Sequence, residues 1–219
     1  MFQAAIFDLD GVLSNTIPYH RAAWQRIAED FNLLLTDEHY AQLRGVTARD
    51  TLELILQWAG RFLSPAERTE KLQLKDRYFG QYVEQLNETD RLPGVPEFLD
   101  SIPSDVAIGL GSSSRSGEAV LTRLGLRSYF GAVVDANTTT RGKPDPEVFL
   151  RAAQLLGVEP ARSIVFEDSP KGIVAARAGG FRTVGVGDPT TLREAEVVIP
   201  GFRFLDFRQV ERLLAVHSD

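Results

Sequence analysis

Short apolar runs alternate with helical stretches along most of this chain, and that alternation restricts the fold more than any other feature. The apolar runs cover residues 3–7, 105–110, 132–135, 163–166, 182–186 and 197–199. Helical spacing of apolar residues fills the segments 93–102, 115–124, 146–156, 170–178 and 206–215 between and after them. Continuous apolar strands that alternate with helices are typical of a parallel sheet covered on both faces. We therefore expect an α/β fold with a Rossmann-like parallel sheet.

One long segment, residues 15–90, carries helical patterns only. Helices are predicted at 16–31, 36–44, 49–59 and 65–87. Ser64 and Glu67 have the spacing of a capping box at the start of the last of these helices. The first strand precedes this block, so the block is predicted to be a helical insertion. We expect an α/β core of residues 1–14 and 91–219, with a four-helix cap of residues 15–90.

Composition excludes several classes of protein. The chain has 219 residues, a net charge of −6 and no cysteine. A disulfide scaffold, a cysteine-based zinc site and thiol catalysis are therefore excluded. The acidic balance makes nucleic acid and anionic membranes unexpected partners. No apolar run approaches the roughly 20 residues of a membrane span, and the start lacks the basic residues of a signal peptide, so a cytoplasmic location is expected.

Polar residues that follow the predicted strands are the candidates for function. Ligands of such sheets bind beyond the carboxyl ends of the strands. The residues found there are Asp8, Asp10, Ser112, Ser113, Ser114, Lys143, Glu167 and Asp168. Four carboxylates, a group of hydroxyls and one amine predict a site for magnesium and phosphate.

The carboxylates predict the metal. Asp8 and Asp10 are two residues apart and leave the first strand on the same side, and Gly11 then permits a tight turn. Asp168 adds a third carboxylate from a neighbouring strand end. This concentration of charge needs a cation, and oxygen ligands in small number suit Mg²⁺.

The other strand-end residues predict phosphate binding. Ser112 is expected to end a strand and open a helix, where its hydroxyl and free N–H groups would hold a phosphate oxygen, although an ordinary helix cap is the alternative. Lys143 lies in the stiff segment Gly-Lys-Pro-Asp-Pro and could neutralise a phosphoryl group. Of Glu167 and Asp168, one is expected to bind the metal and the other to support Lys143.

The motifs together resemble the haloacid dehalogenase superfamily. They are DLDGV after the first strand, a serine after the second, GKPDP, and VFEDSPKGIVAARAGG, in this order across the whole chain. The helical block resembles the cap of one subclass. The segments FDLDGVLSNTIPYHRAAW and LRGVTARDTLELIL, with Lys75, are most similar to the β-phosphoglucomutase family, which interconverts β-glucose 1-phosphate and glucose 6-phosphate.

The resemblance implies a role for each core residue. Asp8 would be the nucleophile that becomes an aspartyl phosphate, and Asp10 the general acid and base. Mg²⁺ would be held by Asp8, the backbone carbonyl of Asp10 and Asp168, with Glu167 supporting the metal site. Ser112 and Lys143 would hold the phosphoryl group. A sugar bisphosphate, such as glucose 1,6-bisphosphate, would be the activator, and a monomer is expected.

In the cap, the resemblance implies recognition of a second, non-reacting phosphate. The candidates for substrate contact are Thr16, His20, Trp24, Arg49, Lys75, Ser114 and Arg115. For His20, four residues before Trp24, packing is the alternative to function.

This sequence departs from the family at three positions. Ala48 stands where the phosphate-gripping cap arginine is expected, and Arg49 comes one residue later, a rotation of about 100° on a helix. Asp76 replaces an asparagine, and Asn15 an aspartate. The departures bear on substrate identity more than on reaction class.

The sequence therefore leaves one leading hypothesis for the function and two alternatives. The first is a magnesium-dependent phosphosugar mutase. The second is a sugar-phosphate phosphatase on the same scaffold, which differs in whether water reaches the aspartyl phosphate. The third is a non-catalytic phosphosugar-binding protein, against which the second aspartate, Asp10, argues, because binding alone does not need it.

Overall fold

The computed structural model describes residues 2–43 and 46–216. The strands are β1 Ala4–Phe7, β2 Ala107–Gly111, β3 Ala132–Val134, β4 Ser163–Glu167, β5 Arg182–Val186 and β6 Val197–Ile199. The helices are α1 Ile17–Glu29, α2 Asp37–Leu43, α3 Ala48–Trp58, α4 Pro65–Val83, α5 Val95–Asp100, α6 Gly117–Arg123, α7 Glu147–Leu156, α8 Pro170–Ala178 and α9 Phe207–Val216. Short 3₁₀ turns cover Glu88–Asp90, Arg127–Tyr129 and Pro160–Arg162.

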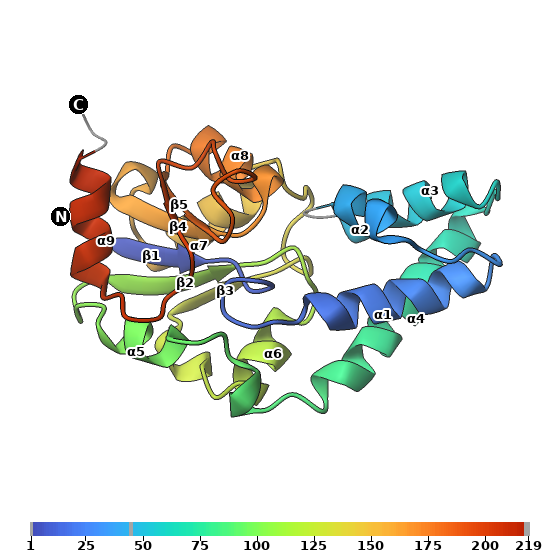
Figure 1. The fold of residues 1–219 in the computed structure, drawn as a ribbon, viewed down its shortest axis with the longest axis horizontal. Helices are drawn as coiled ribbons and strands as arrows, with labels where there is room; N and C mark the ends of the chain where they lie inside the picture. Colours follow the sequence, from blue (N-terminus) through green and yellow to red (C-terminus); the bar gives the residue numbers. More distant parts are fainter. Residues whose placement is uncertain (1, 44–45, 217–219) are drawn as a thin grey trace.

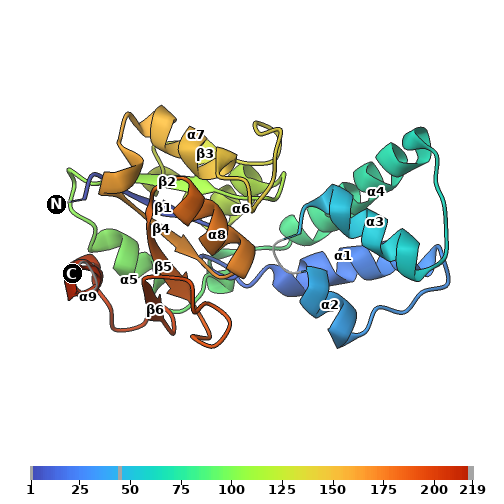
Figure 2. The same ribbon diagram turned by 90° about the horizontal axis from the view of Figure 1, so that it is seen from above.

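The six strands form one parallel sheet (Figure 1), with the order β3-β2-β1-β4-β5-β6 (Figure 2). This is the order of a Rossmann-like sheet, as predicted. Strand β1 lies between β2 and β4, and the order reverses there. The carboxyl ends of these three strands therefore meet at one edge, which is where such sheets bind ligands.

Apolar side chains alternate between the two faces of the sheet. On one face Ile6 and Val165 pack against α7 and α8. On the other face Phe7 and Phe166 pack against α5 and α9, together with residues of α6. The Phe7 and Phe166 rings are stacked with their centroids 4.6 Å apart, because the parallel register places the two residues side by side. Both faces are thus buried, and β1 is held rigidly where it presents its carboxyl end.

Helices α1 to α4 lie together at one side of the sheet (Figure 2). They have an apolar core of their own, in which Trp24 and Ile27 of α1 meet Leu52 and Ile55 of α3. Helix α4 begins with the expected capping box of Ser64 and Glu67. The inserted four-helix cap is therefore confirmed as part of the fold; the exact limits 15 and 90 stay a prediction.

The two segments that join the cap to the core run side by side. Ser14 pairs with Arg91 in an antiparallel bridge. The Ser14 hydroxyl donates to the carbonyl of Asp90 at 2.9 Å, and Leu92 N–H donates to the carbonyl of Leu13 at 2.9 Å. The chain thus leaves the core and returns to it at one place, directly beyond β1.

Within the described ranges 2–43 and 46–216, every helix is too short or too polar to cross a membrane.

Candidate active site

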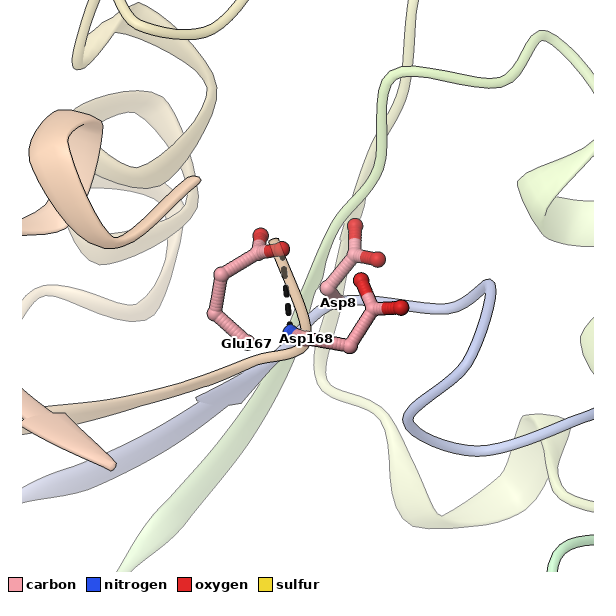
Figure 3. Close-up of side chains that lie close together, drawn as sticks. All are labelled: Asp8, Glu167 and Asp168. Carbon is pink, nitrogen blue, oxygen red and sulfur yellow. Dashed lines mark hydrogen bonds between the residues drawn. The ribbon is translucent and has the colours of Figure 1, made fainter. Parts of the chain in front are cut away.

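Three carboxylates meet at the carboxyl ends of β1 and β4. Asp8, Glu167 and Asp168 each place an oxygen within 4.8 Å of the others (Figure 3). Glu167 is nearly fully buried. Its Oε1 accepts hydrogen bonds from the N–H groups of Asp168 at 3.1 Å and Ser169 at 2.9 Å, and from the Ser169 hydroxyl at 2.7 Å. The Glu167 carboxylate is thus fixed from the start of α8.

Two glycines make room for these carboxylates. Gly11 has a φ of +86°, and a Cβ there would lie closer than 3.0 Å to a carboxylate oxygen of Asp168. A Cβ on Gly172, in the first turn of α8, would likewise lie closer than 3.0 Å to the Glu167 carboxyl group. A side chain at either position would displace an acid of the cluster. The sequence analysis used Gly11 for its turn only and did not single out Gly172.

Lys143 joins the cluster from the other side. Its Nζ donates to Asp8 Oδ1 at 2.6 Å and to Glu167 Oε2 at 2.7 Å, and all three side chains are buried. Burial disfavours the charge, but the two carboxylates outweigh it and raise the Lys143 pKa above its ordinary value. Lys143 is therefore permanently charged beside Asp8, and Glu167 supports it as the sequence analysis anticipated for one of the two acids.

The surroundings of Asp8 disfavour its ionised form. Burial raises its pKa well above the usual range, and Glu167, Asp10 and Asp168 add to the rise, while Lys143 opposes it. Four acids with one lysine leave an excess of negative charge in a buried place. Such a site is costly to ionise fully without a further positive charge.

Asp10 lies outside this cluster of three and faces the cap. Its Oδ1 accepts a hydrogen bond from the Thr16 hydroxyl, and His20 Nε2 lies 3.3 Å from the same oxygen, outside hydrogen-bond geometry. Burial opposes ionisation of Asp10, but His20 and Thr16 outweigh it and lower its pKa. Burial also lowers the pKa of His20. Asp10 is therefore ionised near neutral pH and His20 is neutral.

Thr16, a candidate for substrate contact, lies directly before α1. It occupies the N-cap position of α1, yet its side chain makes no capping hydrogen bond. The hydroxyl bonds Asp10 instead, and the helix begins with Pro18 in its first turn, which lacks an N–H to satisfy.

An aromatic and cationic wall of the cap surrounds His20. The His20 ring stacks on Phe79 of α4, with centroids 3.8 Å apart. Lys75 Nζ lies 5.0 Å from the Phe79 ring centroid and 5.6 Å from that of Trp24, and Lys75 is only 5% exposed. Burial lowers the pKa of Lys75. Sequence reasoning missed Phe79, although its spacing of four from Lys75 puts both on one face of α4.

The serine loop after β2 differs from the expectation. Strand β2 ends at Gly111, but α6 begins only at Gly117, so Ser112 does not open the helix. The buried Ser112 hydroxyl accepts a hydrogen bond from Ser114 N–H at 3.1 Å. The five residues 112–116 form a loop between strand and helix.

The loop after β3 supports this serine loop. This support was not predicted from the sequence. Asn137 Nδ2 donates to the carbonyl of Arg115 at 2.8 Å, and Ala136 N–H donates to the carbonyl of Ser114 at 3.0 Å. The buried Asp135 carboxylate in turn accepts a hydrogen bond from the backbone N–H of Asn137 at 2.9 Å. Asp135, the last residue of the predicted strand 132–135, was the available signal.

Two further candidates for phosphate contact are arginines at the surface. Arg49 is exposed in the first turn of α3. Arg115 is exposed, with its Nε 3.8 Å from Asp76 Oδ2 of α4. Residues 44 and 45 of the LRGVTARD segment lie outside the described residues.

A family sequence model described as haloacid dehalogenase-like hydrolase matches residues 5–186. The chain belongs to this family. Asp8, Lys143 and Asp168 all lie within the matched residues.

Particular members of the family resemble the chain along most of its length. It is 37% identical over 200 residues to "Beta-phosphoglucomutase" of Bacillus subtilis, which covers 90% of this chain and 88% of that protein. It is 32% identical over 206 residues to "Phosphorylated carbohydrates phosphatase" of Thermotoga maritima, which covers 90% and 92%. The crystal structure of β-phosphoglucomutase from Clostridium difficile is similar with a TM-score of 0.94 at 30% identity, over 99% of each chain.

The donor set of this haloacid dehalogenase-like hydrolase fits Mg²⁺. Asp8, Glu167 and Asp168 offer hard oxygen atoms close together, and the buried negative charge calls for a cation. The Asp10 side chain, which the sequence analysis counted with the metal site, lies outside the cluster, so only its backbone carbonyl remains as the predicted ligand.

Proposed function

We propose that the protein is a magnesium-dependent phosphosugar mutase that interconverts β-D-glucose 1-phosphate and glucose 6-phosphate through an aspartyl phosphate and a sugar bisphosphate. One observation carries the proposal. Asp10 accepts a hydrogen bond from Thr16, the N-cap of α1, and lies 3.3 Å from His20 of that helix, while Asp8 two residues away is held by Lys143 of the core. Cap and core each control one carboxylate of a pair suited to nucleophilic and acid–base work.

In the core, Asp8 attacks the phosphoryl group and becomes the aspartyl phosphate. Lys143 and Ser112 hold the phosphoryl oxygens, and Asp8, Asp168 and the carbonyl of Asp10 would hold Mg²⁺. When bound, the metal would neutralise charge on the transferring group. Glu167 keeps Lys143 in place and supports the metal site.

Asp10 carries one proton through the cycle. The 6-hydroxyl of glucose 1-phosphate attacks the phosphorus of the aspartyl phosphate, and the bond to Asp8 breaks. Asp10 takes the hydroxyl proton, which it can accept because its resting form is ionised. After the bisphosphate turns over, its 1-phosphoryl group passes to Asp8. Asp10 then returns the proton to the leaving oxygen, which releases glucose 6-phosphate.

The cap would provide two things that a mutase needs, exclusion of water and a site for the second phosphate. Residues 15–90 would close over the core, exclude water and bind the phosphate that does not react. Lys75 above Trp24, with Ser114, Arg115 and Arg49, provides the hydroxyl and positive charge for that phosphate. The 37% identity to the Bacillus subtilis β-phosphoglucomutase supports this assignment.

A sugar-phosphate phosphatase is the second candidate, and Asp76 favours it. This carboxylate lies 3.7 Å from Lys75 Nζ and 3.8 Å from Arg115 Nε. It competes with a distal phosphate for both cations, so binding of a bisphosphate is weakened. The 32% identity to the Thermotoga maritima phosphatase is consistent with this reading.

Phosphorus NMR distinguishes the two. The purified protein would be incubated with Mg²⁺, β-glucose 1-phosphate and a trace of glucose 1,6-bisphosphate. Glucose 6-phosphate without free phosphate is the expected result. Free phosphate alone would make the protein a phosphatase.

Two variants complete the experiment. Asp8→Asn should abolish both products, because the nucleophile is lost. Asp10→Asn should keep sugar phosphate binding, measured by calorimetry, and lower turnover by about 10²- to 10⁴-fold. Binding without turnover in the unsubstituted protein would support the non-catalytic reading instead.

A further inference from the structure

Cap and core touch at a place where one glycine faces one methyl group. Gly142 precedes Lys143 in the core, and Thr47 precedes α3 in the cap. A Cβ on Gly142 would lie closer than 3.0 Å to Thr47 Cγ2, a separation that real Cβ atoms do not show, whereas Thr47 Cβ would be an ordinary 3.5 Å away. The conflict therefore involves a single methyl group.

The threonine methyl cannot turn aside without loss. Thr47 is the N-cap of α3, and its hydroxyl accepts a hydrogen bond from Asp50 N–H at 3.1 Å and donates to Asp50 Oδ2 at 2.8 Å. These bonds fix the side-chain rotamer, and breaking such a cap costs about 1 kcal/mol. Helix α3 in turn is anchored by Leu52 and Ile55 in the core of the cap.

The glycine side is equally fixed. The carbonyl of Gly142 accepts a hydrogen bond from Asp145 N–H at 3.0 Å. The preceding residues Thr140 and Arg141 donate their N–H groups to the Glu147 carboxylate at 2.9 Å and 2.8 Å. Lys143, the next residue, is locked to Asp8 and Glu167. Any added atom at position 142 would thus move the whole cap and leave the loop in place.

We infer that the absence of a side chain at position 142 sets how closely the cap closes over Asp8, and so determines what share of the phosphoryl groups reaches water in place of a sugar hydroxyl. Gly142 and Thr47 act as positioning residues, because neither touches a reacting atom. The inference about water rests on the proposed function. The contact itself does not.

The consequence of an alanine at 142 follows from carbon radii. Two carbon atoms in ordinary contact are about 3.5 Å apart or more, so the cap would withdraw by on the order of 1 Å. Displacements of that size in an active site change rates by up to roughly 10²-fold.

Four variants test this: Gly142→Ala, Thr47→Ser, the two combined, and Gly80→Ala as a control. Thr47→Ser removes only the methyl group and keeps the capping hydroxyl. Gly80 is also in the cap, within α4, and a Cβ there would have no atom within 4 Å. Thermal unfolding would establish that each variant is folded.

The first readout is the separation of cap from core. Since the chain has no cysteine, Phe62→Cys in the cap and Leu155→Cys in the core, both well exposed, introduce two spin labels for pulsed EPR. Gly142→Ala should lengthen the mean distance and broaden its distribution, and adding Thr47→Ser should restore both. Gly80→Ala should leave the distribution unchanged.

The second readout is the ratio of free phosphate to transferred phosphate. Gly142→Ala should raise this ratio roughly 10- to 100-fold, and the double variant should return it toward the starting value. An unchanged distance in folded Gly142→Ala, or no restoration by Thr47→Ser, would overturn the inference. If the unsubstituted protein transfers no phosphate at all, the proposed function fails, and the distance readout still decides whether Gly142 sets the closure.

Discussion

Asp76 of the cap lies 3.8 Å from Arg115 of the core, between that guanidinium and the Lys75 ammonium group at 3.7 Å. The carboxylate is about one-third exposed and Arg115 is well exposed. Pairs of this kind contribute about 0–1 kcal/mol. The pairing therefore adds little to closure, but it occupies both Lys75 and Arg115.

Removing that carboxylate should improve binding of a bisphosphate. Asp76→Asn is expected to lower the Kd for glucose 1,6-bisphosphate by about fivefold, equivalent to about 1 kcal/mol. Calorimetry would measure it. Asp37→Asn removes the same charge from an exposed pair with Arg21 and should leave the Kd unchanged. Equal affinity in both variants would mean that Asp76 does not compete for the phosphate.

Lys75 should lower the free energy of unfolding although the proposed transfer reaction needs it. The group is 5% exposed, and burial lowers its pKa. Lys75→Met is therefore expected to raise the unfolding free energy by roughly 1–2 kcal/mol and to abolish transfer to sugar phosphate, with slow hydrolysis of a small aryl phosphate remaining. Denaturant titration and activity assays check the two parts.

Lys71→Met serves as its control on the same helix, because Lys71 is more exposed and pairs with Asp30 at 2.6 Å. That change should stay within about 0.5 kcal/mol. A loss of stability in Lys75→Met would show that the aromatic rings and Asp76 outweigh the cost of burial.

Glu147 should make the loop before Lys143 sensitive to acid. Hydrogen bonds from Thr140 N–H, with those of Arg141, lower its pKa from 4.5 to about 2. A lowered folded-state pKa contributes stability that is complete above the unfolded value of 4.5 and is lost as the pH falls toward 2. The Tm of Glu147→Gln should thus lie below that of the unsubstituted protein at pH 6, and the gap should shrink below pH 4.5. A gap that is constant with pH would contradict the assignment.

Magnesium should stabilise the protein through the carboxylate cluster. A ligand at 100 times its Kd adds about 2.7 kcal/mol, so Mg²⁺ should raise the Tm and EDTA should reverse the rise. Asp168→Asn should lose most of this response, and Asp37→Asn should retain it. An equal response in both would place the metal elsewhere.

The sheet could be predicted from sequence because its strands are buried on both faces. Residues 182–186 and 197–199 are apolar runs that coincide with β5 and β6. The start of α6 was wrong by two residues, since the segment from Ser112 to Ser116 is held by Asn137 and backbone bonds of another loop. Asp135 at the end of a predicted strand marks a polar residue there, but the sequence pattern does not show which loop it supports.

Only those site residues that directly follow neighbouring strands could be placed together from the sequence. Asp8 and Asp168 meet because their strands are neighbours. Which way Glu167 turns could not be predicted, because its long side chain reaches Lys143 through space left by Gly172. The stack of His20 on Phe79 depends on how α1 crosses α4. Helical spacing predicts which face of each helix is apolar, but it does not predict which other helix packs against that face.

The bridge between Ser14 and Arg91 has a consequence for how this protein could change over evolutionary time. The chain leaves the core and rejoins it at adjoining points. At the junction with the core, the two ends of the insertion are therefore as close together as the two strands of a hairpin. The entropy of closing such a connection rises only slowly with its length. A different helical module could be exchanged at this junction while the path of the core stays intact. Under the proposed function, substrate specificity is therefore replaceable as a unit, whereas Asp8, Lys143 and Asp168 belong to the core that stays.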